Sequence, residues 1–223
     1  MMQLKSSKVY LFVLHFHGLS DKWWVFKQMG RFSWKRKLIQ KFGFFKMMGT
    51  GSGNGFGIIP DFGTYIWIVT TDNLNAFLTE NPIPEFLIRL RQMRIFEMFP
   101  TKAHGLWNKK RPFEDADSQA NIEDFPLISV ITRGSIKRSM WWKFWKYVPM
   151  VSRQIPSHSL FSIGMGELPL VEQATFSIWK DENEMKTWAY QNASHRQVID
   201  LTRRLGWYDE EMFARFRCRE IYL

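Results

Sequence analysis

The sequence predicts an α+β fold of two ferredoxin-like β-α-β-β-α-β halves, produced by internal duplication, whose sheets cover each other to form a barrel. Two observations predict this fold. Strand-like and helix-like segments alternate along the chain, and the second half repeats sequence blocks of the first in the same order. With 223 residues, 45% of them apolar, the chain can bury a core without disulfides or a structural metal.

The first half opens with a strand, a helix and two further strands. Val9–Phe16 places alternate apolar residues on one face, which is typical of a strand, and Asp21–Arg31 is helical in pattern. Phe44–Gly49 reads as a short strand. The turn-forming stretch TGSGNGFGIIPDFG then leads into Tyr65–Thr70, a strand rich in β-branched and aromatic residues.

Two helices are predicted to complete this half. Asp72 is placed to cap a helix through Asn73–Thr79, and Glu85–Phe99 has apolar residues at near-helical spacing. Thr101–Asn121 is polar, carries both signs of charge and lacks an apolar run, so it is the predicted connection between the halves.

The second half repeats the first. WWVFK at residues 23–27 recurs as WWKFWK from Trp141, FFKMMGTG at 44–51 as LFSIGMG at 160–166, and TYIWIVTTDNLNAF from Thr64 as TFSIWKDENEMKTW from Thr175. Coincidence among aromatic-rich segments is the alternative explanation. Phe213–Cys218 alternates small or apolar residues with arginines and supplies a closing strand.

The predicted domain boundaries follow from this repeat. We expect an N-terminal ferredoxin-like half over residues 1–113, a linker over 114–124 and a C-terminal ferredoxin-like half over 125–223.

Charge is concentrated at the start of the chain. Residues 1–60 hold ten Lys or Arg and one acidic residue, Asp21, whereas the other 163 residues hold 21 basic and 20 acidic residues. The basic residues are interleaved with Trp and Phe, a composition that suits an anionic membrane surface or a nucleic acid. A single cysteine excludes a disulfide framework and a CxxC zinc site. The first 20 residues show no signal-peptide cleavage site, and no stretch reaches the ~18 apolar residues of a membrane-spanning helix.

Several blocks resemble the spheroidene monooxygenase family. They are HFHGL, WWVFKQMG, FFKMMGTGSGNGF, ITRGSIK, VPMVS, IGMGELPLVEQATFSIWKDENEM and ASHRQVIDLTRRLGWYDEEMFARFR. The resemblance runs nearly end to end and is weakest over Thr101–Asp124. It implies an enzyme that uses haem b and O2 to hydroxylate or further oxidise an acyclic carotenoid near its end. It also implies electrons from a small electron-transfer protein such as a ferredoxin, and a dimeric α/β-barrel fold.

His195 is the predicted axial ligand of the haem iron. It follows Ser194, a plausible helix cap, and shares a helix face with Val198, Ile199 and Thr202. By pattern alone, a core histidine satisfied by hydrogen bonds is the stronger interpretation. The resemblance places a histidine in this same block, and it therefore favours haem ligation by His195 and a haem-ligand helix in the C-terminal half.

Other possible ligands are weaker. His15 and His17 lie on one strand face, where they line a cavity or pack at the strand end. Cys218 reads as a small buried residue of the last strand, and His104 and His158 are expected to face solvent.

Arg133 is the predicted catalytic residue. It ends the strand ISVITR within a family-like block, and we assign it to the distal face of the haem or to the haem propionates. A surface arginine at a strand end is the alternative. Gln173, Thr175 and Ser177 share one strand face and either line the distal pocket or reflect half-buried strand polarity.

The glycine-rich loop GTGSGNGFG is not expected to bind a dinucleotide, because no helix opens directly after it. We expect its backbone to approach a cofactor or to cover a cavity mouth. Trp23, Trp24, Trp141 and Trp142 stand beside lysines, and we predict that they form a surface for substrate and membrane, with core packing as the alternative.

The function predicted from the sequence is therefore that of a haem-dependent carotenoid monooxygenase. We expect a cytoplasmic location, peripheral at the inner face of the membrane, and exposed sheet edges that allow a homo-oligomer. The alternatives are a barrel that binds haem or lipid without chemistry and, less favoured, a nucleic-acid-binding protein. The sequence lacks an RNP-like run, so no nucleic-acid partner is predicted.

Overall fold

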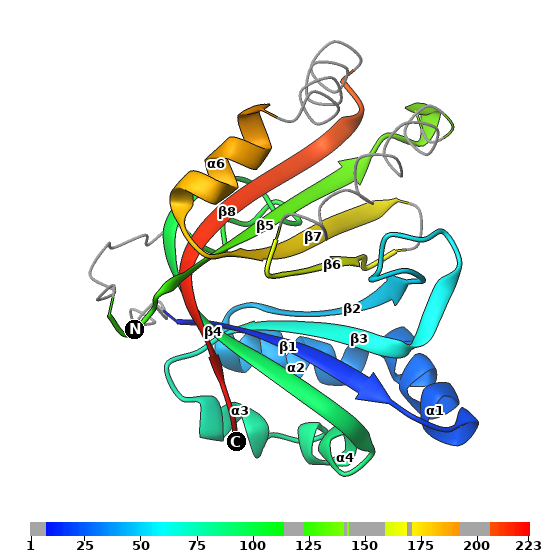
Figure 1. The fold of residues 1–223 in the computed structure, drawn as a ribbon. Coiled ribbons are helices and arrows are strands. Elements are labelled where there is room, and N and C mark those ends of the chain that lie inside the picture. The colour runs from blue at the N-terminus through cyan, green and yellow to red at the C-terminus, as the bar shows by residue number, and fades with distance from the viewer. Residues whose placement is uncertain (1–7, 114–122, 141, 143–158, 169–170, 192–205) are drawn as a thin grey trace.

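The computed structural model describes residues 8–113, 123–140, 142, 159–168, 171–191 and 206–223 (Figure 1). Its elements, in chain order, are β1 (Val9–Phe16), α1 (Leu19–Gly30), α2 (Phe32–Phe42), β2 (Phe45–Gly51), β3 (Pro60–Thr70), α3 (Leu74–Leu78), α4 (Ile83–Leu87), β4 (Leu90–Gly105), β5 (Leu127–Ile136), the 3-10 turn η1 (Arg138–Met140), β6 (Phe161–Met165), β7 (Glu172–Trp179), α6 (Glu182–Gln191) and β8 (Tyr208–Ile221).

The strands form one eight-stranded antiparallel sheet in the order β2-β3-β1-β4-β8-β5-β7-β6. Within it, β1 to β4 are ordered β4-β1-β3-β2, and β5 to β8 repeat this arrangement as β8-β5-β7-β6. Each half therefore has the strand order of a ferredoxin-like unit, as predicted, and the β4–β8 pair joins them. An evolutionary duplication and the packing of a dimer stay predictions.

The two ends of this sheet meet, so that the sheet is a nearly closed barrel (Figure 1). The backbone amide of Gly49 in β2 donates to the Gly166 carbonyl after β6 at 3.0 Å, and the Gly166 amide donates back at 2.9 Å. The Gly164 amide also donates to the Asn54 carbonyl at 2.9 Å. The glycine-rich loop therefore closes the barrel.

Apolar side chains fill the barrel interior. All eight strands contribute one or more buried residues, including Leu11, Met48, Ile66, Phe96, Ile131, Ile163, Phe176 and Phe216. The ring centroids of Phe96 and Phe176 are 5.4 Å apart, and those of Phe113 and Phe216 are 5.2 Å apart. A cavity between or behind the two sheets, which a duplicated barrel is expected to have, stays a prediction.

Helices cover the outer face of the N-terminal half. Val25 of α1, Trp34 and Leu38 of α2, Phe77 of α3 and Phe86 of α4 are all buried against β1 to β4. The outer face of the C-terminal half has a smaller described core, in which Ile128, Val130 and Trp179 are buried and Met185 and Trp188 of α6 pack against them. No helix in the described ranges is both long and apolar enough to cross a bilayer.

Three predictions about the elements need correction. The helix predicted over Glu85–Phe99 is wrong beyond Leu87, because the chain from Leu90 pairs with both β1 and β8, and this pairing overrides the helical spacing. Helix α2 was not predicted. The cap of α3 is Asn73, whose side-chain oxygen accepts from the Ala76 amide at 2.9 Å, and not Asp72.

The polar stretch over Thr101–Asn121 is also only partly a connection. Its first five residues belong to β4, where they pair with β8, and Trp107 and Phe113 are buried in the barrel core. Polarity was misleading here because a strand that ends at a barrel rim carries exposed side chains. Residues 114–122 lie outside the described part of the chain.

Candidate functional site

Arg133 lies on β5 with its side chain on the interior face of the barrel. Its neighbours in register are Ala174 of β7 and Met212 of β8, both buried. The guanidinium donates to the Glu210 carboxylate, lies 3.2 Å from the Glu172 carboxylate and donates to the Asn108 side-chain oxygen at 3.1 Å. Arg133 is only 5% exposed, so the alternative of a surface arginine is excluded.

Glu210 binds both Arg133 and the backbone of a tight hairpin turn. Trp107 and Lys110 exchange backbone hydrogen bonds, and Asn108 and Lys109 between them have φ values of 51° and 62°, the left-handed geometry of a type I′ turn. The Asn108 and Lys109 amides donate to Glu210 at 2.7 and 2.8 Å. Burial opposes ionisation, but these hydrogen bonds and Arg133 outweigh it and leave the pKa of Glu210 below its ordinary value.

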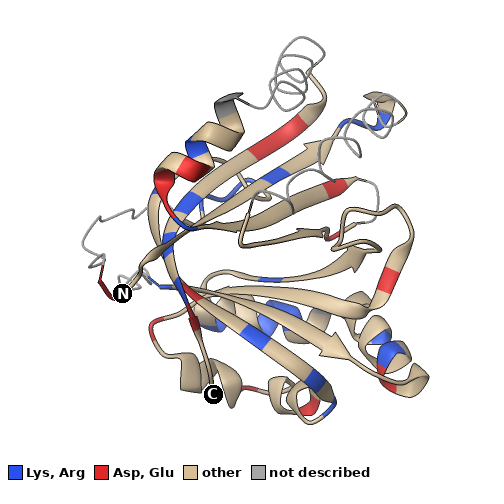
Figure 2. Ribbon diagram, viewed as in Figure 1, with Lys and Arg blue, Asp and Glu red and all other residues tan. Residues whose placement is uncertain are grey.

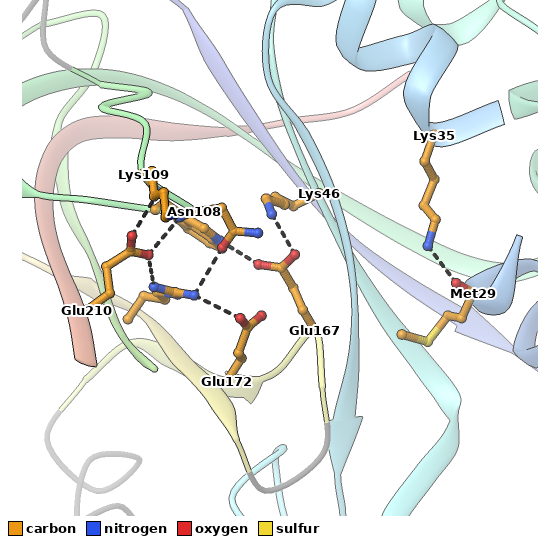
Figure 3. Close-up of polar contacts among 10 residues, drawn as sticks. Met29, Lys35, Lys46, Asn108, Lys109, Glu167, Glu172 and Glu210 are labelled. Carbon is orange, nitrogen blue, oxygen red and sulfur yellow. Dashed lines mark hydrogen bonds and ion pairs between the residues drawn. The ribbon is translucent and has the colours of Figure 1, made fainter. Parts of the chain in front are cut away.

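Glu167 links the same region to the first half of the chain. It accepts from the Trp107 indole nitrogen and from the Lys46 amino group of β2, each at 2.5 Å (Figure 3). The Lys46 amino group lies 5.8 Å from the centroid of the Trp107 ring. Lys46 and Glu167 therefore form an ion pair across the seam where the barrel closes.

Glu172 differs from the other two carboxylates. Burial raises its pKa, repulsion from Glu167 raises it further, and the attraction of Arg133 and Lys46 does not offset these effects. Glu172 therefore takes up a proton more readily than an ordinary glutamate. It is one of three carboxylates in a set that we call the Arg133 cluster: Lys46, Trp107, Asn108, Arg133, Glu167, Glu172 and Glu210.

The outer face of the same strands presents different chemistry. Because Arg133 opposes Ala174, the side chains of Gln173 and Thr175 point to the opposite face of the sheet, together with Ser177. The structure therefore does not bring Arg133 together with these three residues. Ser177 accepts from the Trp179 indole at 3.0 Å, which satisfies its hydroxyl locally.

Part of this outer face is uncovered. Thr132 belongs to β5, a strand paired on both sides, yet its side chain is exposed. Its partners in register, Thr175 and Phe213, are half-buried, and the Phe213 ring stacks on His104 with centroids 5.1 Å apart. We call Thr132, Thr175 and Phe213 the outer strip. It is a place where a flat ligand can contact the sheet.

The predicted iron ligand, His195, lies outside the described residues, as does His158. His15 is half-buried with its Nδ1 atom 3.2 Å from the Thr64 hydroxyl, and burial lowers its pKa. His17 and His104 are exposed. In the part of the chain that the structure describes, no three His, Cys, Asp or Glu side chains gather as a metal site.

Cys218 is buried in β8, as predicted. Burial raises the pKa of its thiol to about 12, and the thiol is therefore protonated at neutral pH. It is a poor source of the thiolate that iron ligation requires.

The predicted tryptophan surface is divided by the structure. Trp23 and Trp142 are exposed, at 60% and 91%, while Trp141 lies outside the described residues. Trp24 is half-buried between the Phe86 ring, 4.8 Å away, and the Arg89 guanidinium, 4.4 Å away. Assigning Trp24 to the surface was therefore wrong, because the turn of the helix directs it inward.

Sequence reasoning missed most of the Arg133 cluster. Its members come from β2, the 106–110 turn, β5, the segment after β6, β7 and β8, and only the fold brings them together. One signal was present in the sequence, since Glu172 stands at the start of a strand, EQATFSIW, whose later residues are mostly apolar.

Comparisons with known proteins agree with the resemblance seen in the sequence. No protein-family model matches the chain. The spheroidene monooxygenase of Cereibacter sphaeroides is 30% identical over 221 residues, which cover 94% of this chain and 66% of that protein. The spheroidene monooxygenase of Rhodobacter capsulatus is 29% identical over 215 residues, covering 93% of this chain and 88% of that protein. The chain thus spans just under two thirds of the length of the first of these relatives.

A solved structure supports the fold. An aldoxime dehydratase in complex with butyraldoxime has a TM-score of 0.55 at 9% identity, with 97% of this chain and 81% of that chain covered.

Proposed function

The chain belongs to the spheroidene monooxygenase family, and from this premise we propose that it is a haem-dependent monooxygenase acting on an acyclic carotenoid. The reaction places one oxygen atom of O2 at a carbon near the end of the carotenoid. The second oxygen atom takes up two protons from solvent and two electrons from a small electron-transfer protein such as a ferredoxin, and it leaves as water. Sequence similarity to these relatives along almost the whole chain is the observation that carries the proposal.

The structure favours one location for the reaction. The barrel interior is filled by side chains, and the outer face of the N-terminal half is covered by α1 to α4. Within the described residues, the outer strip is one part of the sheet that stays open on a central strand. We place the cofactor against Thr132, Thr175 and Phe213.

These residues suit a haem. An aromatic ring and two threonine hydroxyls offer a flat, mostly apolar contact with some polarity, and His195 is the proposed axial donor. When bound, the haem supplies the iron at which O2 is activated. The other donors are less suitable, because the Cys218 thiol is protonated and His15 contacts Thr64 inside the barrel rim.

The Arg133 side chain lies on the face of the sheet opposite the outer strip. It neighbours Thr132 in β5, and its charge is balanced by Glu172 and Glu210. We therefore propose that Arg133 is a positioning residue that holds β5 under the outer strip. Arg133→Ala is expected to retain haem and to impair oxidation. Unaltered turnover by the variant would remove Arg133 from the site.

The first experiment is an absorption spectrum of the protein expressed with a haem precursor, followed by carotenoid turnover with O2 and a reduced ferredoxin. We expect a Soret band at near-unit stoichiometry. His195→Ala should lose this band while its circular dichroism stays unchanged, whereas His17→Ala, a control at an exposed histidine away from the outer strip, should keep it.

Each other outcome identifies an alternative. Haem binding without turnover would indicate a binding barrel that performs no oxidation. A folded protein that binds no haem would contradict the mechanism, and tight, salt-sensitive binding to random DNA would instead support a nucleic-acid-binding protein. An unchanged haem spectrum in His195→Ala would refute the ligand assignment.

A further inference from the structure

An apolar surface protrudes from α1 and from the loop that leads into β3. Six of its side chains are exposed: Leu19, Trp23, Phe26, Ile58, Ile59 and Phe62. The rings of Trp23 and Phe26 stack with centroids 5.8 Å apart, and the edge of Phe26 meets Phe62 at 5.2 Å. These rings join α1 to the start of β3, and together with the exposed Leu19, Ile58 and Ile59 we call them the α1 patch.

Helix α1 has two apolar faces. Leu19, Trp23 and Phe26 follow the i, i+4, i+7 spacing of one helix face and point to solvent. Val25, on the opposite side, is buried against the sheet. Packing within the chain explains the second face but leaves the first exposed, and a contiguous exposed apolar surface of this kind marks a site of interaction.

Positive charge surrounds the patch. The Lys27 amino group lies 5.7 Å from the Trp23 ring centroid, and the Lys22 amino group lies beside Gly63, next to Phe62. Figure 2 shows basic residues on α1 and further ones on α2. Of the two carboxylates nearby, Asp21 lies 3.9 Å from the Arg89 guanidinium, and Asp61 accepts from the Gly63 amide at 2.8 Å.

We propose that the α1 patch docks the protein on an anionic lipid bilayer. Exposed Trp and Phe rings beside lysines are the composition of an interfacial helix, in which the rings enter the headgroup region and the ammonium groups remain among lipid phosphates. Its biological purpose rests on the proposed function, since a carotenoid dissolved in the membrane has to be reached there. The docking itself requires neither haem nor substrate.

Flotation with vesicles tests this proposal on the full chain. The vesicles are phosphatidylcholine alone or with about 30% phosphatidylglycerol, and contain no carotenoid. We expect binding to the anionic vesicles only, weakened when NaCl is raised from about 0.1 M to about 0.5 M. Trp23→Ser combined with Phe26→Ser should weaken binding about tenfold or more. Lys22→Gln and Lys27→Gln should each weaken it about fivefold at low salt.

The control is Tyr222→Ser, which removes a ring that is 87% exposed beside the C-terminus, at a distance from α1 (Figure 1). It should bind vesicles as the parent protein does. Absence of vesicle binding, or equal loss in Tyr222→Ser and the patch variant, overturns the proposal. A patch variant that changes from dimer to monomer in size-exclusion chromatography also overturns it, because the patch would then be a contact between two copies. None of these outcomes depends on oxygenase activity, so the two proposals fail separately.

Discussion

Replacing Arg133 by Ala tests whether the Arg133 cluster holds the barrel together. The side chain of Arg133 is 3% exposed, and those of its ion-pair partners Glu172 and Glu210 are each 18% exposed. Without the guanidinium, Glu210 keeps its two backbone amide donors, but Glu172 loses its ion-pair partner.

The expected loss of stability follows from these contacts. Removing one partner of a buried ion pair lowers the free energy of unfolding by about 3–5 kcal/mol. Because Glu210 keeps two backbone amide donors, we expect a loss of about 3 kcal/mol for Arg133→Ala. For a chain of this size, a loss of about 3 kcal/mol lowers the melting temperature by about 6–12 °C. Arg133→Lys should fall between the parent and Arg133→Ala, because a lysine keeps the charge and loses the forked geometry.

Thermal unfolding followed by circular dichroism at neutral pH measures this effect. The matched control is Arg138→Ala, an arginine five residues further along that is exposed, and it should change the melting temperature by less than about 2 °C. If Arg133→Ala also changes the melting temperature by less than about 2 °C, the cluster does not stabilise the barrel. Activity of the variant is then to be compared at a temperature where it is folded.

Three further predictions concern single groups. Burial and repulsion from Glu167 raise the pKa of Glu172 above its ordinary 4.5. Ionisation of Glu172 therefore destabilises the folded protein as the pH rises from the ordinary value through the raised pKa. Glu172→Gln should therefore be increasingly more stable than the parent from acid to neutral pH, and a pH-independent difference in melting temperature would contradict this. Gly55→Ala should destabilise the barrel strongly, since a Cβ there would lie 1.9 Å from the Gly164 carbonyl oxygen at a φ of +86°. Gly53→Ala, where a Cβ has open space at a φ of +61°, is the control, and equal losses in denaturant midpoint would argue against a tight contact at the seam. Cys218, with a thiol pKa of about 12, should react with Ellman's reagent only in denaturant, and rapid labelling of the native protein would show that β8 opens.

The elements that sequence reasoning predicted well are those with a local signal. Strand β1 was predicted with its observed bounds because Val9–Phe16 is a short apolar run that ends at His17 and Gly18, as in a strand covered on both faces. Strand β4 was mistaken for a helix because both of its faces are apolar: Phe96 and Met98 face the interior, and Ile95 faces the outer core. The spacing of apolar residues then does not distinguish a strand from a helix. The position of a buried charge such as Glu172 depends on strand pairing, which single-sequence patterns do not encode.

The glycine-rich loop shows why a glycine motif has to be judged together with the element that the chain enters next. Its pattern resembled a phosphate-binding loop, but the chain continues into β3, and its backbone rests on Gly164 and Gly166 of the other half. Side chains at these glycines would separate the two ends of the sheet, so the residues serve barrel closure. Apolar side chains of all eight strands occupy the described barrel interior. We therefore expect function on the outer surfaces, where the outer strip offers a place for a cofactor and the α1 patch a contact with lipid.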